Sequence, residues 1–346
     1  MKSNGEEVMS RVLVSILSKQ TIPNYLFIKE MEGQYDQLLF ISTIQANRER
    51  IGEAIEKALG QGEWTVPPIP RIVVDANNYC EALHQLKEQG LSEEDHYLVN
   101  ITGGTKAMSL AVVDYFSLLP HNTIYYLPIN NRYHNITDDR IADISYSLSL
   151  KEYFWLYGID IKVSNAGHRQ PGLARQIYNE LKQINFRQRT KRLLNPHNRY
   201  SEPEDKAYFD GGWFEEYVYH QCKRALGLRE DQVASGIALY RDGEEFNDNE
   251  VDVAYVSENR LYIIECKVWL SAGTENNKKL NSNVHDALYK LAAISKDFGL
   301  VVHSYLFAIY PPSQLSEKNW MFIKRRCKLL GVSGVMTNQE VEKFQG

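Results

Sequence analysis

Short apolar runs alternate with amphipathic stretches along the first 150 residues. Five runs rich in β-branched and other apolar residues predict strands, at Arg11–Leu17, Asp36–Ser42, Arg71–Val74, His96–Ile101 and Thr123–Leu127. Apolar residues at helical spacing predict helices between these runs, at Ala46–Leu59, Asn77–Glu88 and Lys106–Leu118. Repeated strand and helix units favour an α/β fold with a mostly parallel sheet, in which ligands bind at the carboxyl ends of the strands.

The pattern changes twice in the rest of the chain. Residues 149–201 have helical spacing and contain the basic stretch Arg187–Arg192, which indicates a connector. Beyond Pro203 the alternation returns, with helices at Trp213–Leu226 and Val284–Lys296 and strands near Val233–Tyr240, Glu250–Val256, Leu261–Val268 and Leu300–Ile309. We therefore expect an α/β domain at residues 1–150, a helical connector at residues 151–202 and a second α/β domain at residues 203–346.

Composition narrows the class of protein. A length of 346 residues favours two domains. The absence of an apolar run of about 18 residues predicts no membrane span. The four cysteines are far apart and the nine histidines are scattered, so we expect a reducing cytoplasm, no disulfide framework and any metal held by carboxylates. A net charge of −5 argues against a protein that coats nucleic acid, but it allows a local basic groove.

Two neighbouring predicted strands carry a candidate catalytic cluster. Glu265 and Lys267 are two residues apart on one strand, so their side chains share a face. A hairpin across Ser257–Arg260 would bring Asp252 beside them. Paired acids can hold a divalent cation that polarises a phosphate and activates water, and a lysine can offset the developing charge. The pattern favours phosphodiester hydrolysis, although a solvated strand face with paired charges would look similar.

A further carboxylate comes from the helix at Trp213–Leu226. At about 100° per residue, Glu215 lies at the margin of the apolar stripe, whereas Glu216 points nearly opposite it. We therefore expect Glu215 to face the catalytic cluster. The alternative is that both residues are ordinary acids favoured at the start of a helix.

Two polar segments at strand ends predict a second site. Asn100–Lys106 ends a strand and opens a helix, and its glycines, free backbone N–H groups and Lys106 suit an anionic ligand. Ser18–Asn24 is expected to form a polar loop at the same sheet edge. Either segment could instead be an ordinary turn. The predicted ligand contacts are Ser18, Gln20, Thr21, Asn24, Asn100, Thr102, Gly103, Gly104, Thr105 and Lys106.

The motifs of the second half resemble a known family. Gly211–Glu215, the segments N-E-V-D and I-I-E-C-K, and Tyr289–Leu291 are similar to the restriction-endonuclease-like, PD-(D/E)xK half of CRISPR ancillary nucleases that also carry a CARF domain. The resemblance implies that Asp252, Glu265 and the carbonyl of Cys266 ligate Mn²⁺ or Mg²⁺, and that Lys267 is catalytic. The chain departs from the family after the Tyr-Lys-Leu helix, where Phe298-Gly299 stands in place of a Gly-Gly turn.

The two polar segments of the first half resemble the CARF domain of the same family, which has a Rossmann-like fold. This implies that a homodimer binds cyclic oligoadenylate, usually the tetra-adenylate, across its two-fold axis. We expect an activated nuclease that cleaves DNA or RNA in type III CRISPR antiviral defence. The alternatives are a restriction or repair nuclease that needs no nucleotide, a non-catalytic ligand-responsive regulator, and a CARF half that also degrades its activator.

The type of nucleic acid stays open at this point. Contacts to phosphates do not distinguish RNA from single-stranded or duplex DNA. Basic residues that could contact phosphates are Arg187, Arg189, Lys191, Arg192, Lys278, Lys279, Arg325 and Arg326.

Overall fold

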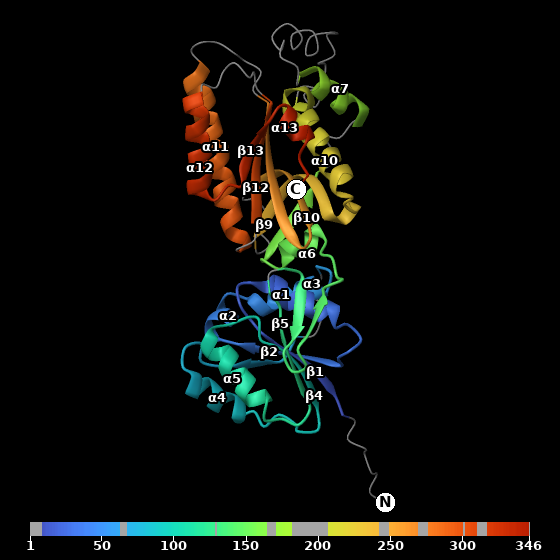
Figure 1. Ribbon diagram of the computed structural model, residues 1–346, viewed down its shortest axis with the longest axis vertical. Helices are drawn as coiled ribbons and strands as arrows, with labels where there is room; N and C mark the ends of the chain where they lie inside the picture. Colours follow the sequence, from blue (N-terminus) through green and yellow to red (C-terminus); the bar gives the residue numbers. More distant parts are fainter. Residues whose placement is uncertain are drawn as a thin grey trace, which may run out of the picture. The chain divides into compact units, whose positions relative to one another are not determined.

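A computed structural model of the chain describes residues 9–62, 68–128, 130–164, 171–181, 207–241, 249–268, 276–299, 302–309 and 317–345. The chain forms two compact units (Figure 1), one of Met1–Leu148 with Trp155–Gly158 and one of Ser149–Phe154 with Ile159–Gly346. Each unit contains its own mixed sheet, which confirms the predicted α/β class. Among the described residues no helix is long and apolar enough to cross a membrane.

The N-terminal unit has a seven-stranded sheet in the order β3-β2-β1-β4-β5-β6-β7. The five predicted strands form β1 (Arg11–Ile16), β2 (Gln37–Ser42), β3 (Arg71–Val73), β4 (His96–Asn100) and β5 (Asn122–Tyr126), all parallel. An antiparallel hairpin, β6 (Arg132–Asn135) and β7 (Arg140–Asp143), extends one edge. The helices are α1 (Thr21–Glu30), α2 (Ile44–Arg48), α3 (Ile51–Leu59), α4 (Tyr79–Lys87) and α5 (Lys106–Phe116).

The helix predicted at residues 46–59 is broken into two helices, because the backbone changes direction between them. Residues 46–59 were expected to form one helix, but α2 ends at Arg48 and α3 begins at Ile51. Between them Arg50 adopts a left-handed conformation with φ 55°, which a helix cannot continue through. The apolar spacing extends across the break, so the pattern alone did not reveal it.

The central strands of the N-terminal unit are buried on both faces. Residues 12–16 of β1 are all buried, as expected for a strand with helices on either side of its sheet. Val12, Val14 and Ile16 pack in a core that α4 and α5 complete. On α1, the Phe27 ring packs 4.9 Å from that of Tyr125. This two-sided burial fixes the strand ends, where the predicted ligand site lies.

The C-terminal unit has a six-stranded sheet in the order β13-β12-β11-β10-β9-β8. Its strands are β8 (Ile159–Val163), β9 (Val233–Arg241), β10 (Asn249–Ser257), β11 (Arg260–Val268), β12 (Val302–Ile309) and β13 (Gly334–Thr337). Strands β8 to β11 are antiparallel neighbours, and β12 and β13 continue parallel to β11. The helices are α6 (Leu150–Trp155), α7 (Pro171–Leu181), α10 (Trp213–Leu226), α11 (Asn276–Ser295), α12 (Glu317–Leu330) and α13 (Gln339–Glu342).

The predicted hairpin between β10 and β11 is present. Ser257 pairs with Arg260, and the two residues between them, Glu258 and Asn259, both have positive φ. Such a two-residue turn matches the twist of the flanking strands and fixes their register. The register continues to Val253 opposite Ile264, which brings Asp252 level with Glu265.

The expected helical connector is partly a strand. Residues 159–163 form β8, which pairs antiparallel with β9 at an edge of the second sheet. Helix α7 packs on α10, where the Tyr178 and Tyr217 rings stack 3.9 Å apart. The expectation of an all-helical segment was therefore wrong for these residues, whose strict alternation of apolar and polar side chains, Ile-Asp-Ile-Lys-Val, is typical of a strand. The basic stretch at residues 187–192 lies outside the described residues.

The two faces of the second sheet carry different helices. Figure 1 shows α7 and α10 on one side of the sheet and α11 and α12 on the other. Trp213 and Phe214 of α10 are fully buried in a core with Val253, Ile264 and Cys266. Since side chains alternate along a strand, Asp252, Glu265 and Lys267 point to the side of α11. This places Asp252, Glu265 and Lys267 on the face opposite to Trp213 and Phe214.

Candidate active site

The hairpin brings the predicted catalytic residues together. Asp252 is 8% exposed and Glu265 3% exposed, so both carboxylates lie in the interior. The Lys267 Nζ atom lies 2.6 Å from Glu265 Oε1 and 3.5 Å from Asp252 Oδ2. The backbone N–H of Cys266 donates a hydrogen bond of 2.7 Å to Asp252 Oδ2, which holds that carboxylate in place. The arrangement is the one that phosphodiester hydrolysis requires of two acids and an amine.

A second lysine, which the sequence did not reveal as a site residue, completes the cluster. Lys290 comes from α11, and its Nζ atom lies 2.7 Å from Glu265 Oε2 and 3.8 Å from Asp252 Oδ1. It belongs to the Tyr-Lys-Leu segment that carried part of the resemblance. Lys290 is 25 residues from Glu265 in the sequence, so neither strand nor helix periodicity predicts that the two side chains meet. They meet only because α11 packs on β11 and β12.

The electrostatics of the cluster favour a cation. Burial is the main cause that raises the pKa of Asp252, and the Glu265 carboxylate raises it further. Burial likewise raises the pKa of Glu215 to about 7, with smaller contributions from Asp252 and Glu250. Burial lowers the pKa of Lys267, but Asp252 and Glu265 outweigh this effect and the pKa is raised. Ionised carboxylates are therefore costly here unless positive charge accompanies them.

The donor atoms suit a hard divalent ion with few protein ligands. Asp252 and Glu265 offer carboxylate oxygens, the ligand type of Mg²⁺ and Mn²⁺. In the part of the chain that the structure describes, no three His, Cys, Asp or Glu side chains converge as a metal site. Two carboxylates are compatible with Mg²⁺, which keeps several waters and binds through one or two acids. The Cys266 thiol lies in the core, where burial raises its pKa well above the ordinary value, so only the carbonyl of this residue could take part.

Helical spacing predicts the environment of Glu215 correctly but not that of Glu216. The charges of Asp252 and Glu265 both act on Glu215, which places it near the cluster as expected. Glu216 is fully buried, although it was expected to point away from the apolar stripe. The π-helical turn η2 (Tyr208–Gly212) explains this, because the Tyr208 hydroxyl donates a 2.8 Å hydrogen bond to Glu216 Oε2. A helical-wheel projection of α10 alone does not include the preceding turn, so it does not predict the burial of Glu216.

The predicted ligand loop depends on its two glycines. A Cβ atom on Gly103 would lie 2.0 Å from the Ile16 carbonyl oxygen, so no other residue fits. Gly104 has φ +74°, a conformation that favours glycine. Thr105 caps α5 by accepting a hydrogen bond of 3.3 Å from the Met108 N–H. The loop thus packs closely on the end of β1 and leaves the start of α5 open.

The two predicted ligand segments meet at the carboxyl ends of β1 and β4, which are neighbours in the sheet. Exposed or half-buried positions, which are available to a ligand, are Ser18, Gln20, Thr102, Gly104, Thr105 and Lys106. Buried positions are Thr21, Asn24, Asn100 and Gly103.

The buried polar residues of this site hold the fold together. Asn24 donates a 2.8 Å hydrogen bond to the Ile16 carbonyl, and Thr21 donates one of 2.8 Å to the Leu156 carbonyl. Asn100 donates to Ser15 Oγ at 3.1 Å and accepts from both the N–H and the hydroxyl of Thr102. The loop expected at residues 18–24 is also shorter than predicted, since α1 begins at Thr21. These side chains position the loops rather than present free donors.

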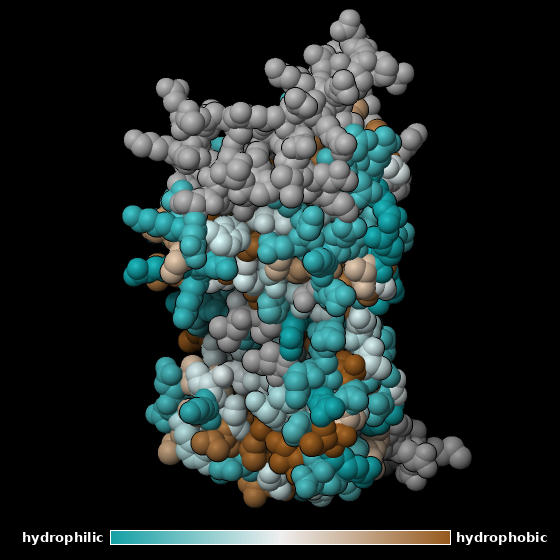
Figure 2. Space-filling view, turned by 45° about the horizontal axis from the view of Figure 1, so that its top comes forward, coloured by the Kyte–Doolittle hydropathy of each residue, from teal (hydrophilic) through white to brown (hydrophobic). Residues whose placement is uncertain are grey.

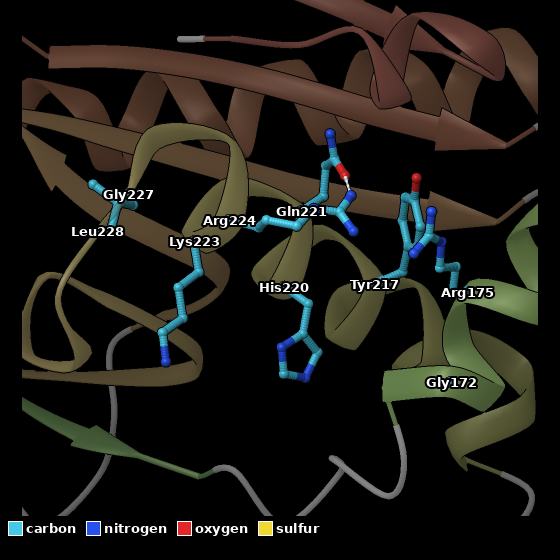
Figure 3. A pocket seen from close by; sticks show the side chains of 9 residues that line it. All are labelled: Gly172, Arg175, Tyr217, His220, Gln221, Lys223, Arg224, Gly227 and Leu228. Carbon is cyan, nitrogen blue, oxygen red and sulfur yellow. Dashed lines mark hydrogen bonds between the residues drawn. The ribbon is translucent and has the colours of Figure 1, made fainter.

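A pocket of about 690 Å³ lies elsewhere on the C-terminal unit, along α7 and α10 (Figure 3). It is lined by Gly172, Arg175, Tyr217, His220, Gln221, Lys223, Arg224, Gly227 and Leu228. Two of its cations have partners: Lys223 is bonded to Glu230, and Arg224 donates a 2.6 Å hydrogen bond to Gln221. At 3.6 residues per turn, Glu215 lies about 170° around α10 from the middle of the lining positions. The pocket is therefore separate from the acidic cluster.

Family comparisons assign both halves of the chain. Residues 12–153 match the family model of the Card1 CARF domain. Residues 202–335 match that of the Card1-like endonuclease domain. The chain is thus a two-domain protein that joins a CARF domain to an endonuclease domain. It belongs to the CRISPR ancillary nucleases of this architecture, with both domains of the Card1 type.

Solved structures share the fold at low sequence identity. VC1899 from Vibrio cholerae is 16% identical with a TM-score of 0.71, over 97% of this chain and 96% of that one. Can2 from Sulfobacillus thermosulfidooxidans, in complex with cyclic tetra-adenylate, is 20% identical with a TM-score of 0.69 over 96% of each chain. A type III CRISPR defence DNA nuclease activated by cyclic oligoadenylate is 18% identical with a TM-score of 0.54, over 86% of this chain and 45% of that one. A comparison with curated proteins finds no match.

Proposed function

We propose that this protein is a divalent-metal-dependent nuclease of the PD-(D/E)xK type, activated by cyclic oligoadenylate in type III CRISPR antiviral defence. The observation that carries the proposal is the convergence of Asp252, Glu265 and Lys267 in an endonuclease domain joined to a CARF domain. The four cysteines are unpaired, which fits action in a reducing cytoplasm.

Each residue of the cluster has a chemical role in this proposal. Asp252 and Glu265 would hold Mg²⁺ or Mn²⁺, whose chemistry is to polarise the phosphate and lower the pKa of a bound water. Lys267 lies close enough to both acids to orient the attacking water and to offset charge that develops on the phosphate. Glu215, whose pKa is about 7, can accept a proton near neutral pH.

The activator site is proposed for the loops at the ends of β1 and β4. Lys106 is exposed at the first position of α5, where unpaired N–H groups and the helix dipole also attract anions. A cyclic oligoadenylate carries phosphates that such a site can bind. The bound cyclic tetra-adenylate in Can2 supports the four-membered ring as the first activator to test.

A homodimer is proposed because one CARF domain offers only half of a two-fold site. Figure 2 shows apolar side chains gathered in a band on the N-terminal unit, in the lower part of the view. Apolar side chains of this unit that are more than half exposed include Ile44, Leu110, Leu118, Ile136 and Ile141. Contiguous apolar surface commonly marks a protein interface.

The proposal is tested by following cleavage of labelled RNA, single-stranded DNA and duplex DNA with Mg²⁺ or Mn²⁺, with and without cyclic tetra-adenylate. We expect cleavage that requires both the metal and the activator. Asp252→Asn and Glu265→Gln should each reduce the rate about 100-fold, since each removes a negative charge that would hold the ion. Activator affinity, measured by calorimetry, should be unchanged in both.

The matched control for these variants is Asp286→Asn, which removes an exposed acid from α11. It should cleave at the parent rate. Full activity of both site variants in the presence of metal would remove the site assignment. Cleavage that needs no nucleotide would favour a restriction or repair nuclease instead, and binding without any cleavage would favour a regulator.

A further inference from the structure

Helix α12 is the most basic described element of the nuclease domain. Its 14 residues include Lys318, Lys324, Arg325, Arg326 and Lys328, with Glu317 as the one acid. The whole chain has a formal charge of −5, so this concentration of positive charge is local. In a protein of negative net charge, such a cluster provides the complementary surface that a polyanion needs.

The exposed face of α12 alternates basic and large apolar side chains. Lys318, Arg325 and Lys328 are exposed at helical spacing. Among them Met321 is 67%, Phe322 50% and Leu329 70% exposed. Exposed apolar side chains that gather on one face often mark an interaction site. Basic groups interleaved with aromatic ones suit nucleic acid, whose phosphates bind the cations and whose bases stack on the rings.

The cations of α12 also differ from those of the pocket on α10. In the described part of the chain, none of the five α12 cations forms an ion pair with an acid. In the α10 pocket, by contrast, Lys223 is paired with the acid Glu230, and Arg224 donates a hydrogen bond to the neutral Gln221. Unpaired cations release more counterions when they bind phosphate, which favours α12 as the binding face.

The α12 face continues to the acidic cluster through two consecutive residues of α11. Lys290 reaches Glu265, while the preceding Tyr289 is 48% exposed and lies beneath Arg326, with the guanidinium 5.5 Å from the ring. Arg326 also lies 5.7 Å from the Phe322 ring, and Phe322 lies 5.4 Å from the His285 ring. Figure 1 shows α11 and α12 side by side. A nucleic-acid strand that leaves the acidic cluster and passes over Tyr289 therefore reaches α12 next.

We propose that the exposed face of α12, together with Tyr289, binds the nucleic-acid substrate beyond the cleaved bond. Phosphates lie on Lys324, Arg325 and Lys328, and a base packs on Phe322. The inference rests on the proposed nuclease function and assigns the path of its substrate. A pocket of about 460 Å³ lies along the same helix, next to this face. Its lining includes Trp320, Lys324 and Lys328.

The test measures binding of a labelled 20-nucleotide single strand to full-length protein carrying Asp252→Asn, with cyclic tetra-adenylate, by fluorescence anisotropy over a range of salt. Adding Lys324→Ala, Arg325→Ala and Lys328→Ala should raise the Kd about 100-fold at 0.1 M salt, since each lost phosphate contact lowers the salt exponent by about 0.7. Phe322→Leu should raise the Kd about 10-fold with an unchanged salt slope.

The matched control is Arg175→Ala, Lys223→Ala and Arg224→Ala, which removes the same charge from the α10 pocket and should leave the Kd within twofold. Thermal unfolding checks that each variant is folded. An unchanged Kd in the α12 triple variant, or an equal loss in the α10 variant, would overturn the inference. The occupant of α12 would then be sought among acidic proteins.

A second measurement separates this inference from the proposed function. The α12 triple substitution, made without Asp252→Asn, should hydrolyse the small diester bis(p-nitrophenyl) phosphate at the parent rate, because this substrate is too short to reach α12. Loss of that activity would mean that the active site itself is damaged and would contradict the proposed role of α12. If the parent protein hydrolyses nothing, the nuclease proposal fails, while the anisotropy experiment still decides whether α12 binds nucleic acid.

Discussion

At the scale of single residues, the buried carboxylates of the acidic cluster are costly to ionise. Burial disfavours the ionised forms of Glu215 and Asp252, and the charge of the nearby Glu265 raises the pKa of both further. Lys267 and Lys290 offset part of this charge. Buried charges contribute little to stability, and acids with strongly shifted pKa values cluster at functional sites.

The first residue-scale prediction concerns Glu215. Its pKa rises from 4.5 in the unfolded chain to about 7 in the fold, so the folded state holds the extra proton between these values. The free energy of unfolding therefore falls as pH rises through this window, by about 3 kcal/mol at pH 8. Glu215→Gln should stabilise the metal-free protein by about that amount at pH 8 and by little at pH 4.5.

Chemical denaturation at both pH values measures this effect, and Asp286→Asn is the exposed control. Adding Mg²⁺ should reduce the advantage of the variant at pH 8, because a bound cation compensates the ionised acid. An equal stabilisation at both pH values would show that the charge of Glu215 is not the cause.

The second residue-scale prediction separates binding from folding in the activator loop. Lys106→Ala removes an exposed charge and should weaken cyclic tetra-adenylate binding about 10- to 100-fold, the range for one charge-assisted contact, with an unchanged Tm. Gly103→Ala should lower both affinity and Tm, because the new methyl group meets the Ile16 carbonyl. Calorimetry and thermal unfolding measure the two quantities, with the exposed Lys87→Ala as control. An unchanged affinity in Lys106→Ala would refute the proposed role of this lysine.

The sequence revealed residues whose neighbours are local and missed those that depend on packing. Glu265 and Lys267 share a face by strand periodicity, and a two-residue turn adds Asp252. Lys290 approaches only after α11 packs on the sheet. Asn24 carries a polar side chain that suggested ligand contact, but the fold uses it to bond the end of β1. Composition cannot distinguish these two uses of a polar residue.

At the scale of elements, some long segments were predicted well, but α12 was not predicted and α11 begins at Asn276 rather than at the expected Val284. The helix expected at Trp213–Leu226 has those bounds in α10, and the strands at β10 and β11 differ by a residue or two from expectation. Short edge strands were missed, namely β7, β8 and β13. Strands β7 and β13 have only four residues each and gain their stability from a neighbouring strand, so their own sequences carry little signal. The alternation in β8, by contrast, is a strand signal inside a segment that was expected to be helical.

The element-scale prediction concerns where the nuclease domain begins. A fragment of residues 203–346 follows the boundary expected from sequence but omits β8 and α7, whose Ile177, Tyr178 and Leu181 are buried in the core. Each such side chain contributes about 1.5–3 kcal/mol, so the loss is comparable with the total stability of a typical domain. We expect that fragment to be unfolded or aggregated, whereas residues 149–346 should unfold cooperatively.

Circular dichroism during heating compares the two fragments, and full-length protein provides the reference. Residues 159–346 test whether α6 contributes as well. A cooperative transition at the same temperature for residues 203–346 and 149–346 would show that β8 and α7 are dispensable.

At the scale of the whole molecule, the sensor and nuclease are separate compact units joined in one chain. Regulation then requires that the activator bind one state of the protein more tightly than another. A shift from 1% to 99% active protein needs a preference of about 10⁴-fold. A dimer that places one ligand across two copies can supply such a preference, because both copies contribute contacts to the same molecule.

The last prediction follows from this coupling. Full-length protein should cleave slowly without cyclic tetra-adenylate and rapidly with it, in each case only with metal. Residues 149–346, which retain the acidic cluster and its supporting strands, should cleave at one rate with or without the nucleotide. Linkage further requires that nucleic acid tighten activator binding by the factor by which the activator tightens nucleic-acid binding, which calorimetry on the Asp252→Asn protein measures. A ligand response in the fragment, or equal rates of full-length protein at all nucleotide concentrations, would show that the CARF domain does not control the nuclease.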